Sequence, residues 1–137
     1  MKMHTYLLFD ANCAEAFHYY EYHLGAKITG LMTYSQAPNA PEMPPEQAKA
    51  VLHARLELGD NVLMASDAAP GLFKTMEGTY LTLSVDSDAE AERIYAALAD
   101  GGNAHTPIQE TFFATRYAQL RDRFGILWMV IHERPMP

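Results

Sequence analysis

The sequence predicts an α+β fold in which two tandem βαβββ modules form a curved, cup-shaped mixed sheet. The first observation is an internal repeat, because Ala14-Glu15-Ala16 and Ala89-Glu90-Ala91 are each followed four residues later by a tyrosine. The second is that a short apolar run precedes each copy, and the third is that three further strand patterns follow it. Two such triplets can arise by chance, since alanine and glutamate both favour helices, but the matching runs before them favour a duplication.

Each module opens with a strand and a capped helix. We expect the strands at residues 4–9 and 79–85, where apolar and β-branched residues are concentrated. In the helices that follow, an N-cap side chain and a carboxylate three residues later have the spacing at which each satisfies the other's backbone amide. Glycine then supplies the left-handed residue that ends each helix. The predicted cap pairs are Asn12 with Glu15 and Ser87 with Glu90, and the terminating glycines are Gly25 and Gly101-Gly102.

Three further strands complete each module. They are expected at residues 27–35, 50–58 and 61–66 in the first copy and at residues 104–110, 113–120 and 126–132 in the second. Turn sequences around Gly59 and Gly125 make the last two strands of each copy an antiparallel hairpin. Four prolines exclude a central strand from residues 36–49, which we expect to form an extended surface arm. We expect a single domain over residues 1–137, with module 1 at about 3–67 and module 2 at about 78–133.

The composition disfavours several classes of function. The chain has 137 residues, of which 49% are hydrophobic, and a formal net charge of −7, so a nucleic-acid-binding surface is not expected. Its longest apolar run, residues 126–131, is far shorter than the roughly 20 residues of a membrane span. Cys13 is the single cysteine, so no internal disulfide can form and nothing indicates an oxidising compartment. We therefore expect a cytoplasmic protein that binds neither nucleic acid nor membrane, with Cys13 buried rather than reactive.

Alternation along the strands separates an apolar face from a polar face. In the third strand, the face expected under the helix has Leu52, Ala54, Leu56 and Leu58, and the other face has Val51, His53, Arg55 and Glu57. The polar face is either exposed, with Arg55 and Glu57 as an ordinary ion pair, or the lining of a cavity formed when the modules bring their sheets together. We take this cavity as the candidate ligand site. Its predicted ligand-binding residues are His4, Tyr6, His53, Arg55, Glu57, Tyr80 and Thr82.

Two blocks of the sequence resemble a known family. The opening block contains Tyr6-Leu7-Leu8-Phe9, Asn12-Cys13-Ala14-Glu15-Ala16, Tyr19-Tyr20 and Leu24-Gly25, and the closing block contains Gln109-Glu110-Thr111-Phe112 and Asp122-Arg123-Phe124-Gly125-Ile126-Leu127-Trp128-Met129. Together they resemble the PhnB-like branch of the vicinal oxygen chelate superfamily, which includes glyoxalases, bleomycin-resistance proteins and extradiol dioxygenases. The resemblance spans nearly the whole chain. It implies two modules around a cup-shaped sheet and, commonly, a homodimer.

The resemblance also implies a position for a metal. Enzymes of the superfamily bind a divalent ion through inward side chains, one each from the first and last strands of both modules. In this sequence those positions fall at His4, Met64, Tyr80 and Met129, and His4 alone is a usual ligand. We therefore predict no metal or other cofactor, with His4 as the one candidate ligand. A one-residue shift in strand register would reverse the inward set and recruit His4, His53 and Glu57 instead.

The resulting hypothesis is a metal-free protein that binds a small molecule, in which Arg55 pairs with an anionic group. Two alternatives remain open. One is a divalent-metal-dependent lyase, isomerase or dioxygenase that uses His4, and the other is a resistance protein that sequesters a cationic drug, which the acidic charge suits. The branch also carries a ubiquinone-methyltransferase label, but the chain has no glycine-rich nucleotide loop to hold a methyl donor. No role is assigned to His18, His23, His105 and His132, and core packing is assigned to Met64, Trp128, Met129 and Val130.

Overall fold

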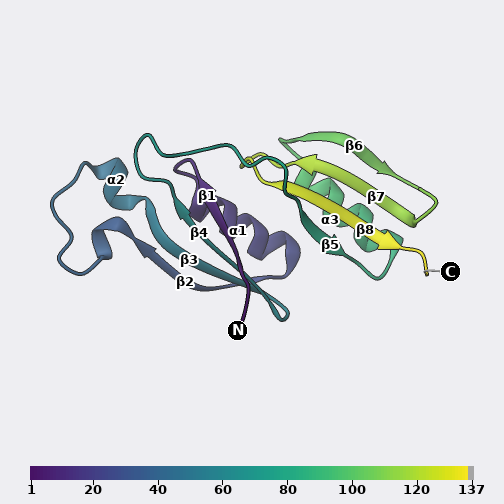
Figure 1. The fold of residues 1–137 in the computed structure, drawn as a ribbon, viewed down its shortest axis with the longest axis horizontal. Coiled ribbons are helices and arrows are strands. Elements are labelled where there is room, and N and C mark those ends of the chain that lie inside the picture. Colours follow the sequence, from purple (N-terminus) through teal and green to yellow (C-terminus); the bar gives the residue numbers. More distant parts are fainter. Residues whose placement is uncertain (136–137) are drawn as a thin grey trace. The chain divides into compact units, whose positions relative to one another are not determined.

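The computed structural model describes residues 1–135 and divides into two compact units, with unit 1 ending at Lys74 and unit 2 beginning at Thr75. Each unit contains a four-stranded mixed sheet and one long helix that contacts it (Figure 1). The order of strand, helix and three strands in unit 1 repeats in unit 2. The predicted α+β fold with tandem βαβββ modules is therefore confirmed.

Unit 1 has its helix between the first and second strands of its sheet. The elements in order are β1 (Thr5–Phe9), α1 (Cys13–Leu24), β2 (Lys27–Thr33), the 3-10 turn η1 (Tyr34–Gln36), α2 (Pro45–Lys49), β3 (Val51–Leu58) and β4 (Asn61–Asp67). The strand order is β1-β4-β3-β2, in which β1 is parallel to β4 and β3 is antiparallel to both neighbours. The predicted hairpin of β3 and β4 is confirmed.

Over its described residues, 75–135, unit 2 repeats this topology without the additional short helices. Its elements are β5 (Leu81–Ser84), α3 (Asp88–Ala99), β6 (Asn103–Gln109), β7 (Ala114–Arg121) and β8 (Leu127–Glu133). The strand order is β5-β8-β7-β6, with β5 parallel to β8 and β7 antiparallel to both neighbours. The first and fourth strands of the repeat therefore pair in parallel in both units.

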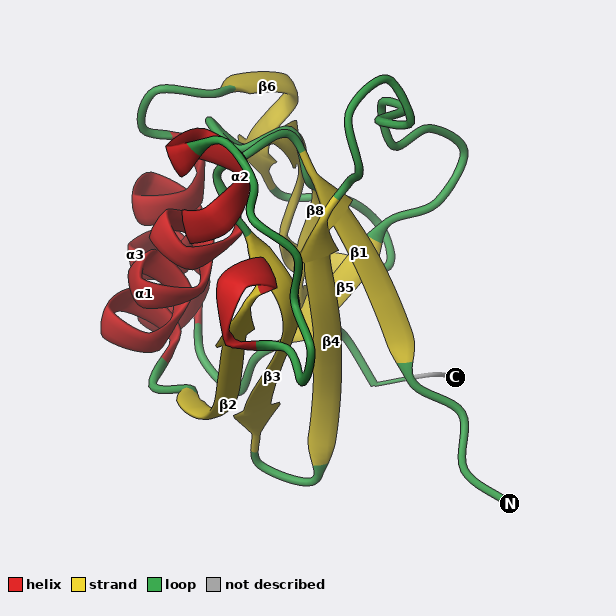
Figure 2. Cartoon of the chain, turned by 90° about the vertical axis from the view of Figure 1, so that its left-hand side faces the viewer, coloured by secondary structure: helices red, strands yellow, loops and turns green. Residues whose placement is uncertain are grey.

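The core of unit 1 lies between α1 and one face of its sheet (Figure 2). The inward side chains of β1 and β3 are buried as the alternation predicts, and they are Leu7, Phe9, Ala54 and Leu56. The prediction that places Val51 on the polar face is wrong, because Val51 is 1% exposed. The pairing of β2 with β3 shifts register between Met32 and Thr33. This irregularity interrupts the alternation at the start of β3 and turns Val51 toward the core.

The core of unit 2 is organised around Trp128, which is 1% exposed, so its predicted core position is confirmed. The indole of Trp128 donates a hydrogen bond of 2.8 Å to Oδ2 of the buried Asp122. Oδ1 of Asp122 accepts the backbone amides of Phe124 and Ile126, each at 2.9 Å. One carboxylate therefore fixes both the turn between β7 and β8 and the central side chain of the core.

The two long helices begin in different ways. Ser87 caps α3 as predicted, because its hydroxyl accepts the amide of Glu90 at 3.1 Å. The predicted cap of α1 by Asn12 is wrong, since the Asn12 side chain makes no capping hydrogen bond. Oδ1 of Asp67, at the end of β4, accepts the amide of Cys13 at 2.9 Å instead. A carboxylate distant in sequence therefore replaces the local cap.

The helix ends follow the glycine pattern. Gly25 follows α1 in the left-handed conformation with φ of 71°, as predicted. After α3, Gly101 has φ of 76°, and a Cβ on Gly102 would lie 2.3 Å from the carbonyl oxygen of Arg121, so only glycine fits there. Within residues 1–135, none of the helices combines the length and the apolar character that crossing a membrane requires.

The proline-rich segment differs from the extended arm that the sequence predicts. It has η1 near its start and α2 near its end, and these two elements contact each other. Helix α2 begins at Pro45, whose fixed φ suits the first turn of a helix. None of the residues of η1 or α2 is buried, so both lie on the surface.

Candidate functional site

The face of the unit 1 sheet that points away from α1 carries the predicted polar residues. Strand pairing aligns Tyr6 with Met64 and Met64 with Arg55, so these residues form one row across β1, β4 and β3. His53 and Glu57 lie two residues to either side of Arg55, and alternation places them on the same side of the sheet. We call Tyr6, His53, Arg55, Glu57 and Met64 the open face of unit 1. All five are exposed or half-buried, so the assignment of Met64 to the core is wrong.

Tyr6 and His53 are in direct contact on this open face. The Tyr6 hydroxyl lies 3.3 Å from Nδ1 of His53, and the two rings are stacked with centroids 5.8 Å apart and 27° between their planes. Because β4 separates β1 from β3, Tyr6 reaches across one strand. His4 lies outside this contact, exposed before the start of β1, and makes no hydrogen bond or ion pair within residues 1–135.

Arg55 differs from the other arginines of the chain. Carboxylates pair with Arg93, Arg116, Arg123 and Arg134, and Arg121 donates to the carbonyl of Gly125. The side chain of Arg55 has neither a hydrogen bond nor an ion pair among residues 1–135, although the residue is half-buried. Glu57 is also without an ion pair in this part of the chain. The alternative interpretation of Arg55 and Glu57 as an ordinary ion pair is therefore wrong.

In unit 2, Tyr80 also contacts a histidine. The Tyr80 hydroxyl lies 2.8 Å from Nε2 of His105. Tyr80 immediately precedes β5 and His105 lies in β6, so this contact joins the two edges of the sheet. The sequence assigns His105 no role, because its contact with Tyr80 depends on the strand order and not on a local pattern. Thr82 is exposed on β5 opposite Met129, which is half-buried rather than in the core.

The residues at the superfamily's metal positions do not fit a divalent ion. Methionine thioethers and a tyrosine phenol offer no hard anionic or imidazole ligand, and His4 remains the single usual donor. The alternative set of His4, His53 and Glu57 is not assembled either, because no group of three or more His, Cys, Asp or Glu in residues 1–135 could hold a metal ion.

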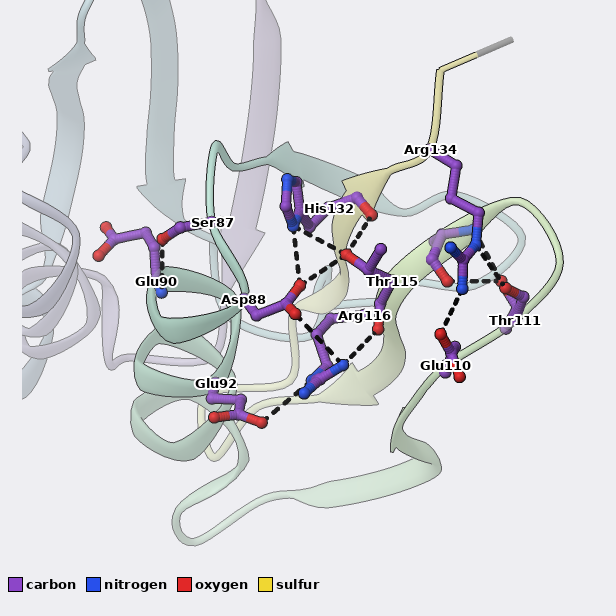
Figure 3. Close-up of polar contacts among 11 residues, drawn as sticks. Ser87, Asp88, Glu90, Glu92, Glu110, Thr111, Thr115, Arg116, His132 and Arg134 are labelled. Atoms are coloured by element: carbon purple, nitrogen blue, oxygen red, sulfur yellow. Dashed lines mark hydrogen bonds and ion pairs between the residues drawn. The ribbon is translucent and has the colours of Figure 1, made fainter. Parts of the chain in front are cut away.

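A second polar cluster lies at the start of α3 in unit 2 and contains none of the predicted ligand-binding residues (Figure 3). Oδ1 of Asp88 accepts a hydrogen bond of 2.6 Å from the Thr115 hydroxyl and one of 2.8 Å from Nδ1 of His132. Arg116 lies 3.4 Å from Asp88 and 3.0 Å from Glu92. The cluster ties the first turn of α3 to β7 and β8. The sequence assigns His132 no role, because its partner Asp88 lies 44 residues away and no local spacing indicates the contact.

The environment of Asp88 favours its ionised form. Hydrogen bonds from Thr115 and His132 hold the pKa of the Asp88 carboxyl below its usual value, and the charge of Arg116 adds to the effect. Beside the cluster is a hollow of about 330 Å³ lined by Ser84, Val85, Asp86, His132 and Glu133. Because the hydrogen bonds of Asp88 and Thr115 are made within the cluster, the clearest role of the cluster is to hold the start of α3 against β7 and β8.

Comparison with models of known protein families identifies the family of this chain. A family model described as 3-demethylubiquinone-9 3-methyltransferase matches residues 1–131. The chain belongs to this family. It is the PhnB-like branch that the opening and closing sequence blocks resemble, so the predicted family is confirmed.

Individual relatives agree with this assignment. Protein YjdN from Escherichia coli (strain K12) is 29% identical over 138 residues, which cover 95% of this chain and 94% of that protein. The crystal structure of protein PA1353 from Pseudomonas aeruginosa is 38% identical, with a TM-score of 0.89 over 98% of this chain and 99% of that one. A glyoxylase/bleomycin resistance protein/dioxygenase domain from Frankia sp. EAN1pec is 19% identical, with a TM-score of 0.68 over 98% of each chain. This last likeness shows the glyoxalase-type fold alone.

Proposed function

We propose that this PhnB-like protein binds a small anionic molecule at the open face of unit 1 and needs no metal to do so. Arg55 carries the proposal, because it is half-buried and has no acceptor within residues 1–135. A guanidinium group binds carboxylates and phosphates through paired, charge-assisted hydrogen bonds. With no acceptor among residues 1–135, the five N–H donors of Arg55 are available to a ligand.

The neighbours of Arg55 narrow the class of ligand. The stacked rings of Tyr6 and His53 provide an aromatic surface, and Nε2 of His53 is free of the contact that Nδ1 makes with Tyr6. Glu57 offers an acceptor two residues from Arg55. These groups favour a ligand with one anionic group and at least one hydrogen-bond donor. Participation of His4, Tyr80 and Thr82 in binding stays a prediction.

The metal-free part of the proposal rests on the available donors. A catalytic Ni²⁺, Zn²⁺ or Fe²⁺ centre requires about three His or carboxylate ligands and one open position. The superfamily positions provide one such ligand, His4, and no alternative cluster forms within residues 1–135. An arginine therefore replaces the metal as the positive group that receives an anion.

The proposal is tested by titrating ¹⁵N-labelled protein with sodium sulfate and, separately, sodium acetate, following the Nε–Hε signal of Arg55 by NMR. Arg55→Gln is expected to weaken binding about tenfold, because it removes a charge-assisted hydrogen bond. Arg93→Gln is the matched control, since it removes the same charge from an arginine that is paired with Glu90.

The control is expected to bind as the wild type does. Equal binding by the wild type and Arg55→Gln, or an Arg55 signal that neither anion shifts, would show that Arg55 is not an anion-binding group.

A further inference from the structure

The sheet of unit 2 presents uncharged side chains in one continuous row. Strand pairing aligns Thr82 with Met129, Met129 with Gln119 and Gln119 with Thr106, so the row crosses β5, β8, β7 and β6. On β7 and β8 these residues alternate with residues buried in the core, namely Ala118, Leu120, Trp128 and Val130. The row therefore lies on the face that points away from α3.

A chain of polar contacts connects this row to Tyr117. The side-chain amide of Gln119 donates to the Tyr117 hydroxyl at 2.6 Å, and the Tyr117 hydroxyl donates to Sδ of Met129 at 3.7 Å. Thr106 lies 3.4 Å from the amide oxygen of Gln119. These contacts hold the phenol ring and the amide in fixed positions. We call Thr82, Thr106, Tyr117, Gln119 and Met129 the neutral face of unit 2.

Aromatic rings extend this neutral face toward the turn between β6 and β7. Phe113 meets Tyr117 edge to face with centroids 5.0 Å apart, and Phe112 meets Phe113 at 5.2 Å. Phe113 is 39% exposed and Phe112 is 93% exposed. Tyr117 therefore partly covers Phe113, whereas the ring of Phe112 is left open to a ligand.

The turn that carries these rings is tied down by hydrogen bonds. The amide of Thr111 donates to the carbonyl of Ala114 at 2.9 Å, and the amide of Ala114 donates to the Thr111 hydroxyl at 3.1 Å. Arg134 donates from its guanidinium to the carbonyl of Thr111 and to Glu110 (Figure 3), and from its backbone amide to Phe113. These hydrogen bonds therefore fix the conformation of the turn that carries Phe112 and Phe113.

We propose that the neutral face of unit 2 binds an uncharged aromatic ring with a hydrogen-bonding substituent, a group of the phenol class. The ring packs against Tyr117, Phe113 and the Met129 thioether, which attract aromatic groups, while Gln119 and Thr106 bind the substituent. The five residues of this face carry no formal charge, unlike Arg55 and Glu57 in unit 1, so an ionic group gains nothing here. This inference goes beyond the proposed function, since it assigns a separate ligand-binding face to unit 2.

Phenol is the probe for this inference, and cyclohexanol is its control because it has the same hydroxyl without the aromatic ring. The methyl signal of Met129 and the side-chain amide signal of Gln119 are followed by NMR. Phenol is expected to shift both signals and to bind about fivefold more tightly than cyclohexanol, the gain that an aromatic contact contributes. Equal affinities, or phenol shifts confined to other residues, would overturn the inference.

Three variants test whether phenol binds at the neutral face or elsewhere on the protein. Phe113→Leu and Gln119→Met are each expected to weaken phenol binding severalfold, and Tyr22→Leu, an equally conservative change at an exposed tyrosine of α1, is expected to leave it unchanged. Circular dichroism of each variant checks the fold. Unchanged phenol affinity in both unit 2 variants contradicts the inference.

Sulfate binding in the same samples distinguishes the two proposals. Loss of phenol binding with intact sulfate binding at Arg55 refutes the ring site alone. Phenol binding at the neutral face without any sulfate binding supports the ring site and refutes the anion site.

Discussion

Asp67 and His132 hold the first residues of the two long helices from corresponding strands of the repeat. Oδ1 of Asp67, in β4, accepts the amide of Cys13 at 2.9 Å, and Nδ1 of His132, in β8, donates to the carboxylate of Asp88 at 2.8 Å. The unit 1 contact uses a buried carboxylate and backbone amides, whereas the unit 2 contact joins half-exposed titratable side chains. Corresponding strands of the repeat therefore hold the two helices by contacts that differ in their sensitivity to mutation and to pH.

Asp67→Asn is expected to destabilise the protein strongly. The carboxylate also accepts the amide of Val51 at 2.8 Å, so it serves two amides with its two oxygens. Asparagine keeps one acceptor and places an NH₂ group against the other buried amide, which costs about 2 kcal/mol or more. Urea unfolding followed by circular dichroism measures the loss.

The control for this change is Asp10→Asn, at an exposed carboxyl between β1 and α1. It is expected to change the free energy of unfolding by less than about 0.5 kcal/mol. If the two variants unfold at the same urea concentration, Asp67 does not hold the start of α1.

The thiol of Cys13 is expected to be inert in the folded protein. Burial raises the pKa of this thiol to about 12, and the negative charge of Asp67 acts in the same direction. At about pH 8 the reactive thiolate is therefore scarce. Ellman's reagent should react slowly with the native protein and rapidly once urea is added, and fast stoichiometric reaction of the native protein would contradict the buried environment.

Asp88 is expected to stabilise the protein near neutral pH and to lose this effect in strong acid. The pKa of Asp88 in the folded protein lies below its ordinary value of 3.8, so its ionised form stabilises the fold. This stabilisation is complete above pH 3.8 and is lost as the pH falls through the lower folded-state pKa. Asp88→Asn should therefore lower the urea midpoint near neutral pH and lose this effect in strong acid.

Asp10→Asn again provides the control, because it removes an exposed carboxyl that makes no hydrogen bond within residues 1–135. A difference between the wild type and Asp88→Asn that stays constant from neutral pH into acid would contradict the role of its ionised form.

Gly30→Leu is expected to block the anion site without unfolding unit 1. Gly30 pairs with Arg55 across β2 and β3, and a Cβ on Gly30 would lie 3.8 Å from the Cβ of Arg55, an ordinary contact. The larger leucine side chain covers the guanidinium, whereas alanine at the same position does not. Sulfate titration should show weaker binding by Gly30→Leu and wild-type binding by Gly30→Ala. Equal affinities would place the anion elsewhere.

Local patterns in the sequence predict the fold well because the repeat, the alternation and the glycine signals act over short distances. The buried positions of Leu7, Phe9, Ala54 and Leu56 follow directly from alternation. The inward turn of Val51 does not, since a register shift depends on how β2 pairs with β3. The cap of α1 by Asp67 is likewise invisible locally, because the two residues that it joins are 54 positions apart.

In the candidate site, too, some features follow from local sequence patterns and others depend on tertiary packing. Alternation predicts that Tyr6, His53 and Arg55 share a face, but it does not predict that Tyr6 contacts His53 or that Arg55 has no acceptor within residues 1–135. The contact of Tyr80 with His105 also depends on the complete strand order. Side-chain pairing across a sheet is set by tertiary packing, which a single sequence specifies only indirectly.

The most direct test of metal-free anion binding is a sulfate titration of protein stripped with EDTA, repeated after one equivalent of Zn²⁺ is added, for the wild type, Arg55→Gln and His4→Ala. We predict that the wild type and His4→Ala bind sulfate equally with and without zinc, and that Arg55→Gln binds weakly in both conditions. Sulfate binding that appears only with zinc and is lost in His4→Ala would contradict the account and support a metal-dependent enzyme.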